Sequence, residues 1–328
     1  MVRGHYREAL IFLFINTILV SSFRFLALTG EFSFAHIVLM GAGAYASALV
    51  TQLGGLSPWL GLPIGVIAAA GTAYLLSFPL FRMKGFYFVI GSFAAGEVIR
   101  QCWVAFRVPF GGADGLMLIP TLALGSLDLG QPLAFYFFAL AVMLLSLVIL
   151  YRLEKSYFGF VLEAIHWQHL LAGSVGVDGR RYRVQAFVIA SAFAGLAGAL
   201  LAHYLTAVNP RDFGLAVMLS VLVWAIAGGL STFAGPIVGV VVLSILDLWL
   251  RAFEEYRPFF YGAVLILTML FLPEGLQGLP TRLMAAVSAL RAPRAGPRRA
   301  AISLRRDTAI EASSANVSLD EEKPARRR

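Results

Sequence analysis

The sequence predicts an all-α polytopic membrane protein with about eight to ten transmembrane helices, some of them interrupted or re-entrant. Of its 328 residues, 59% are hydrophobic and only 13% are charged, and the mean hydropathy is +0.80. A soluble domain of this composition lacks the polar side chains needed to cover its surface. Nine apolar runs follow one another along the chain, and most are near the roughly 20 residues that cross a bilayer.

The apolar runs fall at residues 9–28, 33–50, 60–81, 86–106, 133–151, 184–205, 215–229, 236–250 and 258–272. The first resembles a signal peptide, but no small-x-small cleavage motif follows it, so we interpret it as an uncleaved span. Two runs are short and punctuated by glycine: 33–50, with Gly41 and Gly43, and 215–229, which continues into AGGLSTFAGP. Interrupted helices of this kind occur where they line a cavity or are buried by protein.

A basic, polar stretch at residues 156–187 separates the fifth and sixth runs; it reads SYFGFVLEAIHWQHLLAGSVGVDGRRYRVQAF. Arginines beside a span favour the cytoplasmic side, so we predict a cytoplasmic loop at 154–183 containing a short helix that a soluble partner could grip. Four runs separate this loop from the basic C-terminal end, which puts both on one side. The same count puts residues 108–131 outside. It also puts the N-terminus outside if all nine runs cross, against the charge rule, unless an early run is re-entrant.

Much of the net charge of +8 lies in the last residues of the chain. This distribution suits a tail held at an anionic cytoplasmic membrane face rather than a nucleic-acid groove. Residues 283–328 are rich in Ala, Arg, Ser and Pro and are predicted to be a disordered cytoplasmic tail, which leaves 1–282 as the transmembrane domain. The external loop, with its Gly-Gly, Asp-Gly and Ile-Pro turns, either receives a delivery protein or only connects two helices.

Several polar residues within the apolar runs are candidates for a transport pathway, because ionisable groups there are costly and often functional. Arg24 and Glu31 bracket the junction of the first two runs, where they either line a pathway or sit at the headgroup boundary. Glu97 and Arg100 are three residues apart, a spacing that lets them pair on one helix face, either in the pathway or in helix packing. His36 is a lone histidine at the start of the second run, and either a core group or a pathway residue.

Small residues also recur at helical spacing in ASAFAGLAGALLAH at residues 190–203, a pattern that permits close helix packing. No catalytic motif is present: there is no phosphate-binding GxxxxGK[ST] loop, GxSxG elbow or HExxH pair. With one cysteine, Cys102, the chain can form no internal disulfide or cysteine-cluster metal site. We therefore expect no enzyme activity, cofactor or metal, and energy from a partner or an ion gradient.

An ordered set of motifs resembles the LivM-like permease family of branched-chain amino-acid ABC importers. The motifs are TGEFSFAHIVLMGAGAYASAL (29–49), FYFVIGSFAAGEVIR (86–100), FGGADGL with IP (110–120), YFGFVLEAI…GV (157–177), AFVIASAFAGLAGAL (186–200), AIAGGLSTFAGPIVG (225–239) and LPEGLQGL (272–279). The resemblance implies a type II ABC-importer-like permease in the cell inner membrane. It also implies two ATP-binding subunits, a second permease subunit that completes a heterodimer, and a periplasmic substrate-binding protein.

The resemblance places the ATPase-coupling segment at 159–176, with Gly159, Ala164, Ile165, His166, His169, Ala172 and Gly176 as its site residues. The pathway candidates are Arg24, Glu31, Phe32, Ser33, His36, Gly41, Glu97, Gly228 and Gly229. The chain departs from the family pattern at both regions. The family usually has Asn at position 24 and Gln at position 31, and charged residues at 166–169, so we interpret the chain as a divergent member.

The sequence thus predicts a permease subunit that moves branched-chain or related amino acids, or small amides such as urea, driven by separate ATPase subunits. The alternative is a secondary transporter driven by an ion gradient, in which Glu97 or Glu31 would titrate during transport.

Overall fold

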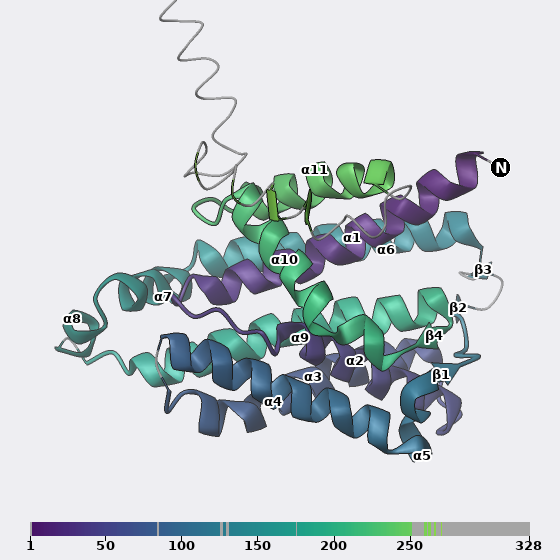
Figure 1. Ribbon diagram of the computed structural model, residues 1–328, viewed down its shortest axis with the longest axis horizontal. Helices are drawn as coiled ribbons and strands as arrows, with labels where there is room; N and C mark the ends of the chain where they lie inside the picture. Colours follow the sequence, from purple (N-terminus) through teal and green to yellow (C-terminus); the bar gives the residue numbers. More distant parts are fainter. Residues whose placement is uncertain are drawn as a thin grey trace, which may run out of the picture. The chain divides into compact units, whose positions relative to one another are not determined.

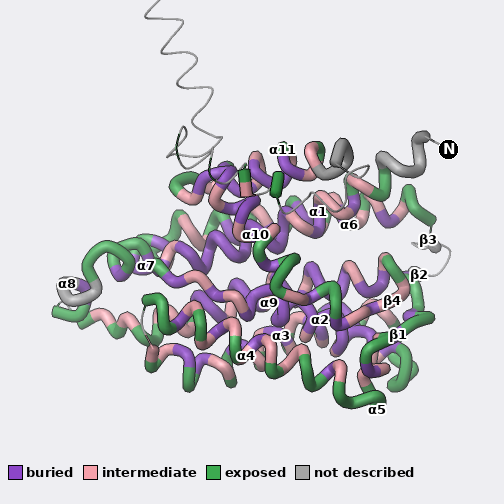
Figure 2. The backbone as a smooth tube through the Cα atoms, viewed as in Figure 1, coloured by how far each residue is buried: buried purple, intermediate pink, exposed green. Residues whose placement is uncertain are grey.

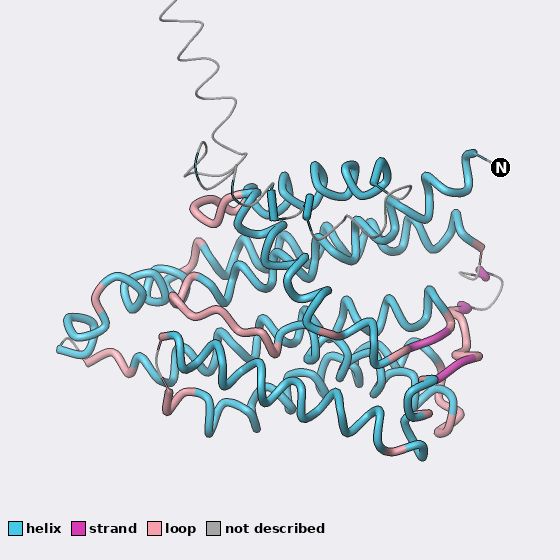
Figure 3. The backbone as a smooth tube through the Cα atoms, viewed as in Figure 1, coloured by secondary structure: helices cyan, strands magenta, loops and turns pink. Residues whose placement is uncertain are grey.

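The computed structural model describes residues 2–83, 85–124, 127–128, 131–174 and 176–250, together with the isolated positions 259–260, 262–263, 266 and 270. All of them belong to one unit, Met1–Gly278. Helices dominate this part of the chain, and the strands are two residues long (Figure 3). This confirms the predicted all-α class.

The helices are α1 (Val2–Ala27), α2 (His36–Gln52), α3 (Pro58–Leu80), α4 (Phe86–Ala105), α5 (Arg107–Phe110), α6 (Pro132–Glu154), α7 (Tyr157–Trp167), α8 (His169–Ser174), α9 (Gly179–Leu205), α10 (Leu215–Gly228) and α11 (Ala234–Leu250). Two 3₁₀ turns, η1 (Gly112–Asp114) and η2 (Pro210–Phe213), lie between them. Strand β1 (Leu116–Met117) pairs antiparallel with β4 (Ala207–Val208), and β2 (Ala123–Leu124) with β3 (Leu127–Asp128).

Local sequence signals explain where several helices begin. Pro58 and Pro132 occupy the first positions of α3 and α6, where the missing N–H of proline costs no helical hydrogen bond. The carboxylate of Asp178 caps α9 by accepting hydrogen bonds from the backbone N–H groups of Arg180 and Arg181, at 3.1 and 3.2 Å. Helix α9 can therefore start directly after the α7–α8 segment.

The helix bundle has two ends, which we call the strand end and the α7 end (Figure 1). At the strand end, the amide of Gln52 donates to the carbonyl of Met117, and Nδ1 of His203 lies 2.8 Å from the carbonyl oxygen of Pro120. At the α7 end, the last residue of α6 is followed by α7 and α8. The first turns of α1 lie toward the strand end, because Phe12 packs edge-on against Tyr204. Helix α1 therefore runs without interruption from the strand end to the α7 end.

Helix α9 lies at the centre of the bundle and packs against α1, α2 and α3. A Cβ atom on Gly198 would collide with the carbonyl of Met40, and one on Gly43 would collide with the backbone of Gly195. These contacts confirm the prediction that the small residues of α9 permit close helix packing. Figure 2 shows the buried positions gathered along α1, α2 and α9.

Helices α3 and α6 present apolar side chains outward. We compare the buried share of residues in the most apolar window of each helix. This share is 72% for α1, but only 33% for α3 and 22% for α6. The outward residues include Ile67 and Leu75 on α3 and Phe137 and Leu144 on α6. Among the described residues, four helices are long and apolar enough to cross a membrane: α1 from Arg7, α3, α6 and α9. Exposed apolar side chains on such helices indicate a lipid-facing surface, as expected for a multi-pass membrane protein.

The prediction of an interruption inside residues 33–50 is wrong. Helix α2 is continuous through Gly41 and Gly43, and the irregular backbone precedes it, at residues 28–35. Gly41 serves packing instead, since a Cβ there would lie 2.7 Å from the rings of Trp103 and Phe213. The other short run is confirmed: α10 has 14 residues and spans about 21 Å, less than the roughly 30 Å of hydrocarbon. The run at 258–272 and the tail at 283–328 lie largely or wholly outside the described residues.

Candidate functional site

The predicted coupling segment forms two helices rather than one. Helix α7 ends at Trp167, Gln168 breaks the helix with φ −148°, and α8 follows from His169. Gly176 then takes a left-handed φ of +86°, which glycine adopts without steric cost. The segment is therefore a compact unit of two short helices between the ends of α6 and α9.

Helix α7 has one buried and one exposed apolar face. Val161 and Ile165 face inward and form a small core with Ala172 of α8. The opposite face carries Tyr157, Phe160 and Trp167, whose exposed fractions are 72%, 69% and 76%. Phe160 follows Tyr157 by three positions and Trp167 follows Phe160 by seven. These spacings place the three side chains in one stripe along the helix. We call this stripe the α7 aromatic stripe.

The predicted coupling residues divide between these two faces. Ile165 and Ala172 are buried inside the α7–α8 unit, whereas Ala164, His166 and Gly176 are exposed. Gly159 is buried at the start of α7, where a Cβ atom would collide with the backbone carbonyl of Glu154. His169 belongs to α8, and its side chain lies outside the described part of the chain. Only the exposed members of the set are available to a partner.

A buried ion pair joins α1 to the end of α6. Arg24 is 3% exposed and donates to both carboxylate oxygens of Glu154, through Nη1 to Oε2 and through Nη2 to Oε1 at 3.1 Å. Its Nε donates to the carbonyl oxygen of Leu230 at 3.1 Å, and its guanidinium lies 5.9 Å from the ring centroid of Phe233. Arg24 therefore holds together α1, α6 and the turn between α10 and α11, directly beside the start of α7.

A second ion pair joins the α1–α2 connection to α9. Oε1 of Glu31 lies 3.4 Å from Nη1 of Arg183. Burial raises the pKa of Glu31 above its usual range, and the charge of Arg183 opposes that rise. Gly30, with φ +80°, turns the chain here, and a Cβ on it would lie 3.1 Å from Nδ1 of His166. The α1–α2 connection thus contacts α7 directly.

Arg24 and Glu31 do not pair with each other, because α1 ends at Ala27 and Gly30 reverses the chain between them. Sequence reasoning missed both of their partners, Glu154 and Arg183. These partners are 130 and 152 residues away in the chain, so no local periodicity points to them.

The remaining pathway candidates lie around the start of α2, at the α10–α11 turn and, for Glu97, on α4. His36 is fully buried, and its Nε2 lies 3.0 Å from the hydroxyl of Ser22, which itself donates to the carbonyl of Leu19. Among the described residues, Nδ1 of His36 and the hydroxyl of Ser33 meet no hydrogen-bond partner. The ring of Phe32 lies 6.0 Å from that of Phe23. This region is a buried cluster with unused hydrogen-bonding capacity.

The glycine pair Gly228 and Gly229 ends α10. Gly229 has φ +105°, and a Cβ on Gly228 would collide with the backbone of Gly235. The two glycines therefore allow α10 and α11 to fold back tightly on each other, beside the contact of Leu230 with Arg24.

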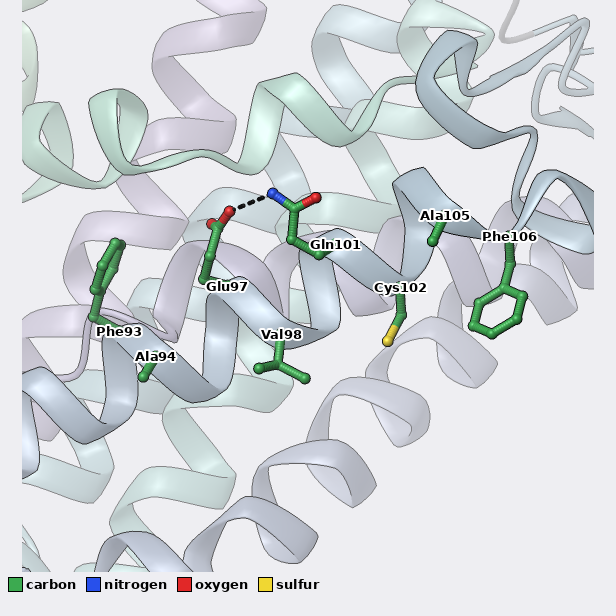
Figure 4. A pocket seen from close by; sticks show the side chains of 8 residues that line it. All are labelled: Phe93, Ala94, Glu97, Val98, Gln101, Cys102, Ala105 and Phe106. Carbon is green, nitrogen blue, oxygen red and sulfur yellow. Dashed lines mark hydrogen bonds between the residues drawn. The ribbon is translucent and has the colours of Figure 1, made fainter.

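A shallow hollow of about 540 Å³ runs along α4 (Figure 4), lined by Phe93, Ala94, Glu97, Val98, Gln101, Cys102, Ala105 and Phe106. Its carboxylate, on Glu97, accepts hydrogen bonds from Nε of Arg100 at 2.8 Å and from Nε2 of Gln101 at 2.7 Å. The predicted pairing of Glu97 with Arg100 is confirmed. Glu97 also lines a narrow cleft together with residues of the α1–α2 connection, α2, α4, η2 and α10. Among the described residues, no three His, Cys, Asp or Glu side chains gather to hold a metal ion.

Comparison with known proteins adds sequence relatives to this geometry. Residues 6–269 match the family model described as "Branched-chain amino acid transport system / permease component". The high-affinity branched-chain amino acid transport permease LivM of Escherichia coli K12 is 30% identical over 257 residues, which cover 71% of this chain and 60% of that protein.

The high-affinity branched-chain amino acid transport permease LivH of the same organism is 30% identical over 112 residues, which cover 34% of this chain and 36% of that protein. A probable branched-chain amino acid permease LivH of Methanocaldococcus jannaschii is 24% identical over 263 residues, covering 72% of this chain and 79% of that protein. The chain spans 60% of the length of the LivM relative that it matches. No solved structure gives a significant match.

Proposed function

Because this chain belongs to the family of branched-chain amino acid transport permease components, we propose that it is one permease subunit of an ATP-driven importer. Its cargo is a branched-chain or related amino acid, or a small amide such as urea. The subunit lies in the cell inner membrane with residues 1–282 as its transmembrane domain and residues 283–328 as a cytoplasmic tail. It hydrolyses no ATP itself.

The observation that carries this proposal is the α7 aromatic stripe. Three large aromatic side chains, Tyr157, Phe160 and Trp167, are about 70% exposed on a helix whose other face is already packed. Exposed aromatic stripes of this kind mark contact surfaces, and aromatic residues dominate binding energy at interfaces. We propose that an ATP-binding subunit docks here, one on this chain and one on the partner permease.

The contacts at the α7 end give a route from this docking surface into the bundle. His166 of α7 lies against the Gly30 turn, and the two ion pairs flank the α7–α8 unit on either side, at Glu154 and at Arg183. A rigid displacement of α7 therefore pulls on the segment 24–36 and on the α10–α11 turn. Together, these two segments contain the pathway candidates other than Gly41 and Glu97.

The other partners follow from the two remaining surfaces. The strand end carries residues 108–131, where a periplasmic substrate-binding protein delivers its cargo. The open hollow on α4 faces a second permease subunit, which completes the pathway in a heterodimer. Neither surface is suited to nucleic acid, since the exposed charge is not gathered into a basic groove.

The proposal is tested by purification of the complex in mild detergent from cells that express the whole transporter. ATP-binding subunits should co-purify with the wild-type chain, and replacing both Phe160 and Trp167 with alanine should release them. Phe137 is 60% exposed on the lipid-facing α6, so Phe137→Ala is the matched control and should keep them bound. Uptake that depends on a proton gradient, with no ATPase subunits attached, would instead support the ion-gradient alternative.

A further inference from the structure

The ion pair on α4 lies within the helix, in its C-terminal half. Glu97 and Arg100 are the twelfth and fifteenth of the twenty residues from Phe86 to Ala105. Among the charged side chains that the structure describes on the long helices, the others lie near helix ends: Arg7 and Glu8 at the start of α1, Arg24 near its end, Arg152 and Glu154 at the end of α6, and Arg180, Arg181 and Arg183 at the start of α9. Among the described residues, Glu97 is thus the charged side chain that lies deepest within a long helix, and Arg100 lies one turn nearer the end of α4.

This pair is also open on one side. Glu97 is 33% exposed and Arg100 is 18% exposed, and the hollow beside Glu97 is lined by α4 alone. A charged pair facing hydrocarbon is costly, so such groups face a polar pathway or a protein partner. The open side of the hollow therefore faces either the transport pathway or the second permease subunit proposed above, which would supply its opposite wall.

The chemistry of the pair selects a ligand with both charges. Glu97 supplies one carboxylate, and Arg100 has a third nitrogen, Nη1, that meets no partner among the described residues. An α-amino acid carries its ammonium and carboxylate on one carbon, so it can place the ammonium on Glu97 and the carboxylate on Arg100 at the same time. The net charge of the site stays at zero. Arg100 does not itself line the hollow, so its side chain has to turn toward a ligand that is bound there. Gln101 donates to Glu97 and keeps the carboxylate in place while Arg100 turns.

We infer that Glu97 and Arg100 form a binding site for the ammonium and carboxylate groups of a zwitterionic amino acid, with the apolar wall of the α4 hollow receiving its side chain. The wall consists of Phe93, Ala94, Val98, Cys102, Ala105 and Phe106, and a volume of about 540 Å³ falls within the range of small-molecule sites. This inference rests on the proposed function and narrows the proposed range of cargo to zwitterionic amino acids. Urea and simple amides carry neither charge, so they form weaker hydrogen bonds with the pair than a ligand that carries both charges.

Cys102 lines the same hollow, is exposed, and is the only cysteine of the chain. It therefore reports on occupancy without any engineered label. The experiment measures the rate at which N-ethylmaleimide alkylates Cys102 in the whole purified transporter, by mass spectrometry of this chain. L-leucine should slow alkylation by about tenfold at saturation. Urea, leucinamide (cation only) and 4-methylpentanoate (anion only) should leave the rate unchanged.

Three variants test the residues. Glu97→Gln and Arg100→Gln should each weaken protection by leucine by about tenfold or more, with protection measured as the ratio of the alkylation rates with and without leucine in the same variant. The double variant carrying both changes leaves no unpaired charge. If the pair serves only helix packing, protection by leucine should return in the double variant. If the pair binds the ligand, protection should stay lost. Asp114→Asn removes an acidic group at the strand end, outside the hollow, and should protect like the wild type.

Three results would overturn the inference: equal protection by leucine and urea, recovery of protection in the double variant, or a Cys102 that N-ethylmaleimide never reaches. Each of these can occur while ATP-dependent uptake and attached ATPase subunits persist. The site would then fail alone, whereas loss of the ATPase subunits from the wild-type complex would refute the proposed function.

Discussion

Replacing Glu154 with leucine should destabilise the protein strongly, because it leaves the guanidinium of Arg24 buried without its carboxylate. Arg24 is 3% exposed and Glu154 is 13% exposed, so water can solvate neither well. Removing one partner of a buried pair costs roughly 3–5 kcal/mol of unfolding free energy. Because Arg24 retains the carbonyl of Leu230 and the ring of Phe233, we expect the lower end of that range, about 3 kcal/mol.

The double replacement Arg24→Met with Glu154→Leu should recover most of this loss, since a buried pair exchanged for apolar residues of similar size is often near neutral. The assay is reversible unfolding in mixed detergent with SDS, analysed as a double-mutant cycle. Glu163 is exposed on α7, so Glu163→Leu is the control and should stay within about 0.5 kcal/mol of the wild type. A Glu154→Leu variant that unfolds like this control would refute the buried, bonded pair.

Three further substitutions test other parts of the α7 end. Gly159→Ala should displace α7 and reduce the amount of co-purified ATPase subunit, because the added Cβ collides with backbone. The control Gly173→Ala, whose added Cβ meets open space, should not reduce it. Equal retention of the ATPase subunit in both variants would show that α7 tolerates the shift. Gly176→Asp should abolish transport yet keep the chain in the membrane. The space around Gly176 is open, and its φ of +86° costs a non-glycine residue only about 1–2 kcal/mol. Loss of the chain from the membrane would show that the variant fails to fold. Burial raises the pKa of Glu31 above 4.5, although the attraction of Arg183 opposes the rise. The protonated side chain of Glu31 therefore contributes fully to stability below pH 4.5, and this contribution is lost as the pH rises through the raised pKa. Glu31→Gln should therefore melt higher than the wild type at neutral pH, with the gap closing toward pH 4.5, and a lower melting temperature at neutral pH would show that the ion pair outweighs the cost of burial.

Local patterns in the sequence predicted the features that depend on neighbours along the chain. The helices follow from runs of apolar residues near the length of a membrane span, and the Glu97–Arg100 pair follows from a spacing of three. The close packing of α9 follows from its small residues at a spacing of four. Each of these signals lies within one helix, where geometry is fixed by the backbone alone.

Features that depend on distant segments could not be predicted in this way. Gly41 and Gly43 suggested a broken helix because glycine weakens an isolated one, yet α2 is continuous, since the space they leave is filled by Trp103, Phe213 and the backbone of α9. The break in the α7–α8 segment at Gln168 was also missed. Its cause is tertiary, because Ala172 has to turn back to join Val161 and Ile165 in one core.

The two ion pairs at the α7 end have a joint mechanical consequence. Arg24 pairs with Glu154, the last residue of α6, and Glu31 pairs with Arg183, near the start of α9. If only one tie existed, α7 could swing about it without moving α1 and α2. With a tie on each side, and with His166 resting on the Gly30 turn between them, a push on the α7 aromatic stripe has to displace the whole 24–31 segment. If the charge at position 24 serves this purpose, exchanging the partners, as Arg24→Glu with Glu154→Arg, should restore part of the ATP-dependent uptake that either single change abolishes. The restoration should be partial, because a carboxylate at position 24 cannot donate to the carbonyl of Leu230. A double variant as inactive as the singles would show that Arg24 acts through Leu230 and Phe233 rather than through the charge pair.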